Sequence, residues 1–287
     1  MRNQLVLLFG VLAVASSVVF IRESDAPPIM LAAWRCLLAA LIIAPLALRS
    51  GELRPHALLD GLRQAAWPAL WLAVHFVTWN IGARLIPAAN ATLLVSLVPL
   101  AMPVVLWAML RERITRREGA ATAIACIGLV ILAMSDFDTD PAWLLGDAVC
   151  FGSMVLLTVY LAYSRKQDDG QSIWRYLLPL YTLAGLLCLL AGLLLEGGYW
   201  PRGGYPWLQV VGIAVVPMVI GHSILNWGMR VFSGQHVALV ALLQFVFAGV
   251  LGLWLYGEVP NLAFVSTSTA ITLAAAWVIH ASERVDA

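Results

Sequence analysis

Charged residues are scarce in this chain of 287 residues. Asp, Glu, Lys and Arg together make up 11% of it, whereas hydrophobic residues make up 62%. A soluble domain of this length carries roughly 25% charged residues, because its surface must face water. The shortage of charge excludes an ordinary soluble domain, and it predicts a protein embedded in a lipid bilayer.

Cysteine and the motifs of catalysis are scarce as well. No pair of cysteines has CxxC spacing, so neither a disulfide framework nor a zinc site is indicated. The chain also lacks HExxH, GxSxG and Walker motifs, which disfavours the rival interpretation of an integral-membrane enzyme. We therefore expect no enzyme activity, no cofactor and no metal. The four cysteines fall inside apolar runs and are expected to pack there: Cys36, Cys126, Cys150 and Cys188.

Long apolar runs are what the chain has instead. A membrane-spanning helix needs roughly 20 mostly apolar residues. Ten runs of about that length can be marked, near 4–21, 28–48, 65–83, 87–110, 117–135, 142–164, 173–195, 207–229, 234–256 and 261–281. The sequence thus predicts an all-α integral membrane protein with ten transmembrane helices. Its expected partners are the bilayer and a small-molecule substrate rather than nucleic acid, and the expected unit is a single chain.

The first run resembles a signal peptide, with Ala13-Val14-Ala15 as the apparent cleavage site. It nevertheless stays apolar as far as Ile21 and then stops at Arg22. We therefore expect this run to be retained as the first helix.

Basic residues gather on one side of the predicted helices. The loops on the side of the N terminus hold thirteen Lys and Arg residues, and the loops on the other side hold three. The positive-inside rule then places both termini in the cytoplasm, and we expect a bacterial inner membrane. The three basic residues on the outer side are Arg22, Arg84 and Arg202.

The chain repeats itself. The segment Asn80–Arg84 returns 146 positions later as Asn226–Arg230, and the same shift carries Glu112 onto Glu258. A second echo relates Trp34-Arg35 to Trp174-Arg175. These echoes predict two related halves, 1–140 and 141–287. Five spans is an odd number, so the two halves must be inverted relative to each other in the membrane, as in many secondary carriers.

One acidic cluster could be taken for a cation site. Asp136, Asp138 and Asp140 precede Pro141 on the predicted outer side. Three acids this close could hold a cation, but such a cluster is more often a solvated loop. We favour the loop.

These features together resemble an EamA-type carrier of the drug/metabolite transporter superfamily, which includes bacterial exporters of aromatic amino acids. The resemblance covers the whole chain. Besides the ten spans and cytoplasmic termini, it rests on the arginine in helix two, the prolines of helix four and the acids that close helices four and nine: Arg35, Pro99, Pro103, Glu112 and Glu258. The second half departs from the pattern, because Phe245 and Gly249 stand where the first half has its prolines.

Polar groups at membrane depth are candidates for function. Helical i, i+4 spacing aligns Trp71 with His75 and Trp79, and it aligns Met218 with His222 and Asn226. The resemblance implies that helices three, four, eight and nine line a central cavity. The candidate cavity residues are Trp71, His75, Trp79, Asn80, Pro99, Met102, Met218, His222, Asn226, Gln244 and Phe245. The alternative is that these histidines bridge helices and these large side chains only pack.

The remaining marked residues are expected to be structural. We expect Arg35 and Arg175 to reach toward the membrane surface, where they anchor helix ends or form ion pairs. Glu112 and Glu258 follow their helices closely and are expected to pin loops and topology.

The predicted function is export of small neutral metabolites, most of all amino acids with apolar or aromatic side chains, by alternating access. The presumed cavity is aromatic and nearly neutral, which suits a zwitterion. The first helix has no acid, whereas small multidrug carriers of the same superfamily use a glutamate there. Efflux of other solutes such as purines or lipophilic compounds remains the alternative.

Overall fold

The computed structural model describes residues 1–49, 55–135, 141–167, 172–257 and 259–283, and every regular element within them is helical. In chain order the elements are α1 (Arg2–Ala15), α2 (Ser17–Glu23), α3 (Pro28–Arg49), α4 (Pro55–Leu85), α5 (Ala88–Val95), α6 (Val98–Leu110), α7 (Arg116–Ser135), α8 (Pro141–Lys166), α9 (Ile173–Leu195), α10 (Gly204–Ile213), the π-helix η1 (Ala214–His222), α11 (Ser223–Val231), α12 (Gly234–Ala241), α13 (Leu243–Tyr256) and α14 (Leu262–Glu283).

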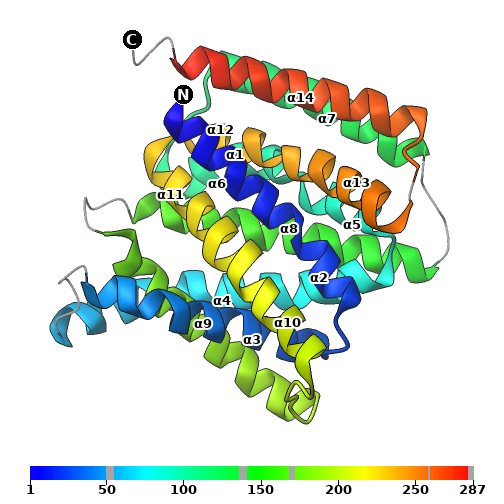
Figure 1. Ribbon diagram of the computed structural model, residues 1–287. Coiled ribbons are helices and arrows are strands. Elements are labelled where there is room, and N and C mark those ends of the chain that lie inside the picture. Colours follow the sequence, from blue (N-terminus) through cyan, green and yellow to red (C-terminus); the bar gives the residue numbers. More distant parts are fainter. Residues whose placement is uncertain (50–54, 136–140, 168–171, 258, 284–287) are drawn as a thin grey trace.

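The helices form one bundle with two paired edges (Figure 1). Helices α7 and α14 pack together at one edge, and α3 packs on α9 at the opposite edge. Between the edges lie the helices that surround the centre, among them α1, α8, η1 and α12. The start of α1 and the end of α14 lie at the same end of the bundle (Figure 1). An even number of crossings requires this placement.

Eight helical segments in the described residues are long and apolar enough to cross a membrane. Helices α4 and α7 are not among them, so two of the ten expected spans do not meet this measure. Polar residues such as His75 and Asn80 lower the mean hydropathy of α4, which packs against α8 and α9 inside the bundle. Helix α7 is apolar after the charged Arg116-Arg117-Glu118, and it pairs with α14; its described side chains end at residue 132, which leaves a stretch too short for this measure.

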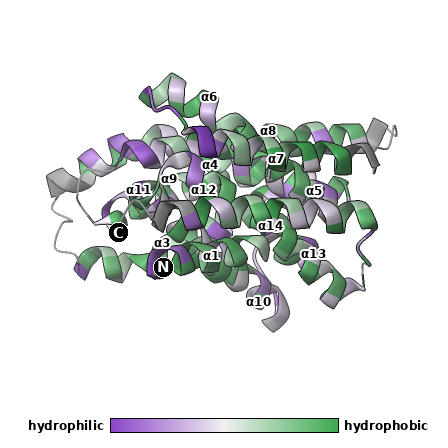
Figure 2. Cartoon of the chain, turned by 90° about the horizontal axis from the view of Figure 1, so that it is seen from above, coloured by the Kyte–Doolittle hydropathy of each residue, from purple (hydrophilic) through white to green (hydrophobic). Residues whose placement is uncertain are grey.

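The outer surface of the bundle is apolar. Figure 2 shows hydrophobic residues along most of the helices. Leu194 and Leu195 of α9, for example, are 75% and 76% exposed. Such side chains are stable only if lipid tails cover them, because a surface this apolar would aggregate in water. The structure agrees with the membrane location that the composition predicts.

Glycines bring α3 and α9 close together. A Cβ atom on Gly185 would lie 2.7 Å from the side chain of Leu37, and one on Gly192 would lie 2.4 Å from the sulfur of Met30. Small residues let membrane helices approach closely, because van der Waals contact replaces the hydrophobic driving force that lipid does not provide. This contact also sets the rotation of α3 and therefore the direction in which Arg35 points.

Candidate functional site

A small cavity lies among the central helices of the bundle. Its volume is about 30 Å³, enough for one or two water molecules. Side chains from both halves of the chain line it: Val14, Ala15, Ser17, Val18, Arg35, His75, Trp79, Thr92, Val95, Val98, Leu157, Leu161, His222, Leu225, Ala241 and Gln244. Val14 and Ala15 belong to the apparent cleavage site of the first run, so that run supplies part of the cavity wall.

Helices are interrupted where they border the cavity. The break between α1 and α2 falls at Ser16, the break between α5 and α6 at Ser96-Leu97, and the break between α12 and α13 at Leu242. The fourth irregular segment is η1, which contains Pro217. Non-helical backbone is tolerated at membrane depth only where it is buried or lines a cavity, and π-turns are frequent at functional sites. The interruptions mark this region as the candidate site.

Two of these breaks stand at equivalent positions of the sequence repeat. Ser96 and Leu242 are 146 positions apart, and in each break the amide N–H is shared between the carbonyls three and four residues earlier. Ser96 donates to Leu93 O at 3.1 Å and Thr92 O at 3.0 Å, and Leu242 donates to Leu239 O and Ala238 O, both at 3.3 Å. The first break precedes Pro99, whereas the second has Phe245 at that position. The second half therefore keeps the helix break although it lacks the proline that follows the break in the first half.

Four of the predicted cavity residues line the cavity: His75, Trp79, His222 and Gln244. The rings of His75 and His222 lie 6.4 Å apart between centroids, and Phe76 packs edge-on against His222 at 5.0 Å. Ser153 holds His75, because its carbonyl and hydroxyl oxygens lie 2.9 Å and 2.8 Å from Nδ1. The Nδ1 atom of His222 has no hydrogen-bond partner in the part of the chain described.

The other predicted residues do not line the cavity. Asn80 donates to Pro28 O at 2.9 Å, and the side chain of Asn226 bonds Tyr160, Ser164 and the carbonyl of His222. Phe245 turns toward α14, with its ring 4.6 Å from that of Phe264. The remaining four also lie outside the lining: Trp71, Pro99, Met102 and Met218.

The i, i+4 spacing does not by itself decide which side chains reach the cavity, since Trp71 in the first half and Met218 in the second both lie outside its lining. Met218 and His222 belong to the π-helix η1. Met218 is fully buried elsewhere, and His222 reaches the cavity.

The prediction for Arg35 is wrong. Arg35 does not reach a membrane surface: it is fully buried, lines the cavity, and its guanidinium lies 3.8 Å from the ring centroid of Phe76. Arg35 stands seven residues after the start of α3, roughly 10 Å along the axis at 1.5 Å per residue. The side chain cannot reach the end of the helix from that depth, a constraint that could have been read from the predicted run.

Sequence reasoning also missed two hydroxyls of the wall. Ser17 accepts a hydrogen bond from Trp79 Nε1 at 3.4 Å, and Thr92 presents a buried hydroxyl without a partner among the described residues. Both residues lie in segments that border a helix break. A predicted interruption of an apolar run could therefore have indicated these two hydroxyls as candidates.

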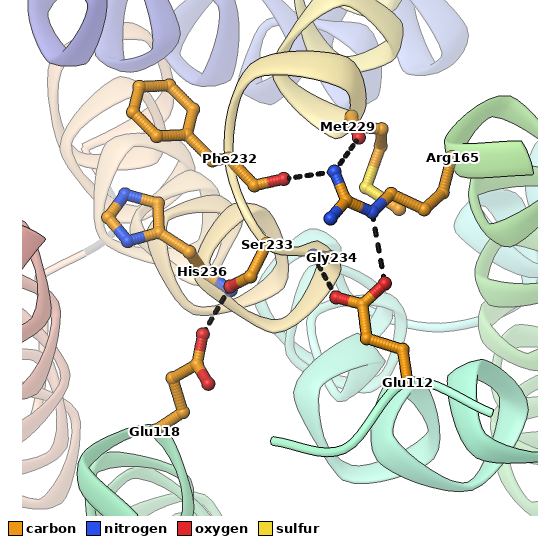
Figure 3. A network of polar contacts seen from close by, with 8 residues as sticks. All are labelled: Glu112, Glu118, Arg165, Met229, Phe232, Ser233, Gly234 and His236. Carbon is orange, nitrogen blue, oxygen red and sulfur yellow. Dashed lines mark hydrogen bonds and ion pairs between the residues drawn. The ribbon is translucent and has the colours of Figure 1, made fainter. Parts of the chain in front are cut away.

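A polar network at the end of the bundle that holds the N terminus joins α8 to the segments that begin α7 and α12 (Figure 3). Arg165 of α8 pairs with Glu112 at 3.0 Å and donates to the carbonyls of Met229 and Phe232 at 2.9 Å and 2.8 Å. Glu112 also accepts from the amide of Gly234 at 3.4 Å. Glu112 therefore has the structural role expected of it. Beside it, Glu118 accepts from the hydroxyl of Ser233, the N-cap of α12.

Polar contacts also join the helices at the opposite end. Arg84 donates to the carbonyls of Ser24 and Ala26, both at 2.9 Å, and so holds the turn after α2. Glu196 accepts from the amides of Ile29 and Met30 at 3.0 Å and 2.9 Å, which ties the end of α9 to the first turn of α3. Polar contacts therefore hold helices together at both ends of the bundle.

Two predictions concern residues that cannot be placed. Glu258 and the cluster Asp136, Asp138 and Asp140 lie outside the described residues. Within the described residues, no group of three or more His, Cys, Asp or Glu side chains could hold a metal ion.

Comparison with known proteins assigns the family. The EamA-like transporter family matches residues 2–134 and again residues 142–280. The chain belongs to the EamA-like transporter family. An "Uncharacterized transporter" of Archaeoglobus fulgidus is 25% identical to this EamA-like protein over 247 residues, covering 85% of this chain and 84% of that one. A solved structure described as "Crystal structure of protein" has the same fold, with a TM-score of 0.77, 20% identity and 96% of both chains covered.

Proposed function

We propose that this EamA-like transporter exports small neutral amino acids, including those with apolar and aromatic side chains, by alternating access around the central cavity. The proposal includes ten spans arranged as two inverted repeats, 1–140 and 141–287, with both termini in the cytoplasm of a bacterial inner membrane. Two separate family matches support the repeat. The equivalent breaks at Ser96 and Leu242 support it as well.

One observation carries the transport mechanism: residues of both halves line the cavity, which is too small to hold a solute. A pocket for a small ligand has a volume of about 300–1,000 Å³, whereas this cavity has about 30 Å³. A solute can enter only if one end opens and the central helices move apart. Polar contacts at each end and broken helices at the centre suit such a change.

The composition of the wall supports the substrate class. Apolar side chains such as Val18 and Leu157 dominate it, Trp79 adds an indole ring, and the described lining residues include no carboxylate. Apolar walls discriminate weakly, since one methylene is worth about 1–3 kcal/mol. We therefore expect one site to serve several neutral amino acids. The missing carboxylate disfavours lipophilic cations, which would enter without a counter-charge.

Transport into liposomes tests the proposal. Purified protein in liposomes should take up labelled phenylalanine and leucine, with mutual competition, and cells that overproduce it should resist toxic amino-acid analogues. Empty liposomes are the control. Uptake no greater than the control for every amino acid would reject the proposal. Equal transport of a quaternary ammonium dye, abolished by collapsing the proton gradient, would favour drug efflux instead.

The topology is tested separately. A reporter that is active only in the periplasm, fused after residue 287, should remain silent, because thirteen of the basic residues lie on the side of the termini and basic loops stay in the cytoplasm. The same reporter inserted in the turn at Gly197-Gly198 should be active. The reverse pattern would contradict the proposed orientation.

A further inference from the structure

Arg35 is an unpaired charge at the centre of the molecule. It has no exposed surface, and none of its three guanidinium nitrogens has a hydrogen-bond partner in the residues that the structure describes. The Cζ atom of Arg35 lies over the face of Phe76, 3.8 Å from the ring centroid. Burying a charge without a partner is costly, and ionisable groups at membrane depth mark substrate pathways.

The groups that share the cavity with Arg35 offer donors and no counter-charge. Among the described residues, none that lines the cavity is Asp or Glu. His222 is 3% exposed, and its Nδ1 has no partner in the described part of the chain; the hydroxyl of Thr92 is likewise unpartnered. Phe76 lies against both the Arg35 guanidinium and the His222 ring. A cation and nearby unsatisfied polar atoms thus face a space that contains no anion of the protein itself.

We propose that Arg35 binds the carboxylate group of the transported solute and thereby decides the substrate class. This inference rests on the proposed function, since it assigns a recognition element to the same cavity. The planar guanidinium matches a carboxylate with two parallel hydrogen bonds. Solutes without a carboxylate are rejected, because they leave the buried guanidinium unpaired.

The charge balance favours a carboxylate over a phosphate. One carboxylate neutralises one guanidinium, and the ammonium group of an amino acid can face the ring of Trp79. A phosphate dianion instead brings surplus negative charge next to apolar walls that include Val14, Val18 and Leu157. Burying surplus charge in apolar surroundings is unfavourable. The part of the solute beyond its carboxylate packs against these walls.

Ligand-induced stabilisation of the wild-type protein in detergent tests the assignment directly. Phenylalanine and 3-phenylpropionate, which carry the carboxylate, should raise the unfolding temperature, because a ligand that binds only the folded state stabilises it. 2-Phenylethylamine, which lacks the carboxylate, and inorganic phosphate should not. In liposomes, phenylethylamine should compete with labelled phenylalanine at least about 100-fold more weakly than unlabelled phenylalanine does. Equal competition by the amine, or stabilisation by phosphate alone, would overturn the inference.

Substitution of Arg35 separates recognition from structure. Arg35→Gln should keep an unfolding temperature at least as high as that of wild type, because it removes an unpaired buried charge, yet should lose the shift caused by phenylpropionate. Its transport should fall at least about 100-fold, and Arg35→Lys should retain more of it. The matched control is Arg175→Gln, at the position that echoes Arg35 in the second half but lies outside the cavity lining; this variant should keep the shift and the transport.

The results distinguish this inference from the proposed function. Normal transport with an unchanged KM in Arg35→Gln would overturn the inference and leave amino-acid export standing. If the wild-type protein transports no amino acid, the proposed export function is rejected. The ligand-induced stabilisation of the wild-type protein then still decides whether Arg35 binds a carboxylate. If Arg35→Gln does not fold, the wild-type ligand series and Arg35→Lys decide.

Discussion

Asn226 shows how a polar side chain is kept inside an apolar bundle. It is fully buried, and its amide bonds Tyr160, Ser164 and the carbonyl of His222, one turn earlier. This arrangement ties α11 to α8 directly behind the cavity wall. Asn226 therefore supports His222 from outside the site, although its sequence position suggested that it lined the cavity.

Replacing Asn226 tests that supporting role. Asn226→Ala leaves buried polar groups of α8 and η1 without a partner, which should reduce the free energy of unfolding by about 1–3 kcal/mol. Denaturant unfolding in detergent measures the loss. Ser266→Ala is the control, because Ser266 is exposed and bonds only carbonyls of its own helix. Equal stability of the two variants would contradict the role.

Accessibility to a thiol reagent tests the cavity wall. In a variant without native cysteines, cysteine at Trp79 or His222 should react with a small polar reagent, and substrate should slow the reaction, because both positions line the cavity. Cysteine at Ile127, which is 62% exposed on the outer face of α7, should react only with a lipid-soluble reagent. The opposite pattern would place Trp79 and His222 outside the substrate path.

The helices combine close packing at the edges with irregular backbone at the centre. Glycines fix α3 against α9, whereas the breaks at Ser16, Ser96 and Leu242 interrupt the helices around the cavity. Elements with incomplete hydrogen-bond ladders are the ones that open most easily. Alternating access at the level of elements is therefore expected to bend the central helices and leave the α3–α9 pair intact.

Two glycines, one at the α3–α9 contact and one in open space, test whether that contact must stay close. Gly185→Ala should destabilise the protein by about 1–3 kcal/mol, because the new Cβ would meet Leu37, including its backbone nitrogen at 3.0 Å. Gly152→Ala meets nothing within 4 Å, and alanine favours a helix by roughly 1 kcal/mol over glycine. Thermal unfolding in detergent should therefore separate the two variants. Equal stability would show that α3 and α9 tolerate a wider spacing.

At the scale of the whole molecule, the closed state depends on contacts between the halves. Glu112 comes from the first half, and Arg165 with the carbonyls of Met229 and Phe232 comes from the second. The pair is about a quarter exposed, with side-chain exposures of 26% and 24%, so solvent screens the attraction between its charges. The bonds to two carbonyls add to the closure and make Arg165 its central residue.

Removing Arg165 should favour the state that is open at that end. A loss of about 1–2 kcal/mol of closure shifts the population roughly 5- to 30-fold. A membrane-impermeant reagent applied from the side of the termini should then label cysteine at position 222 faster in Arg165→Ala than in the parent. Arg165→Lys, which keeps the charge, should lie between them. An unchanged rate would show that this network does not hold the closed state.

The sequence by itself determined the membrane location, the helical class, the two related halves and most of the helix positions. These properties follow from residue type summed over about 20 positions, which neighbouring helices do not alter. Tertiary structure decided which polar side chains share the centre. The direction in which a side chain points depends on helix rotation, which for α3 follows from its close contact with the glycines of α9. For that reason Arg35, which the sequence suggested for a membrane surface, lies in the cavity, whereas Met218 and Asn226 lie behind its wall.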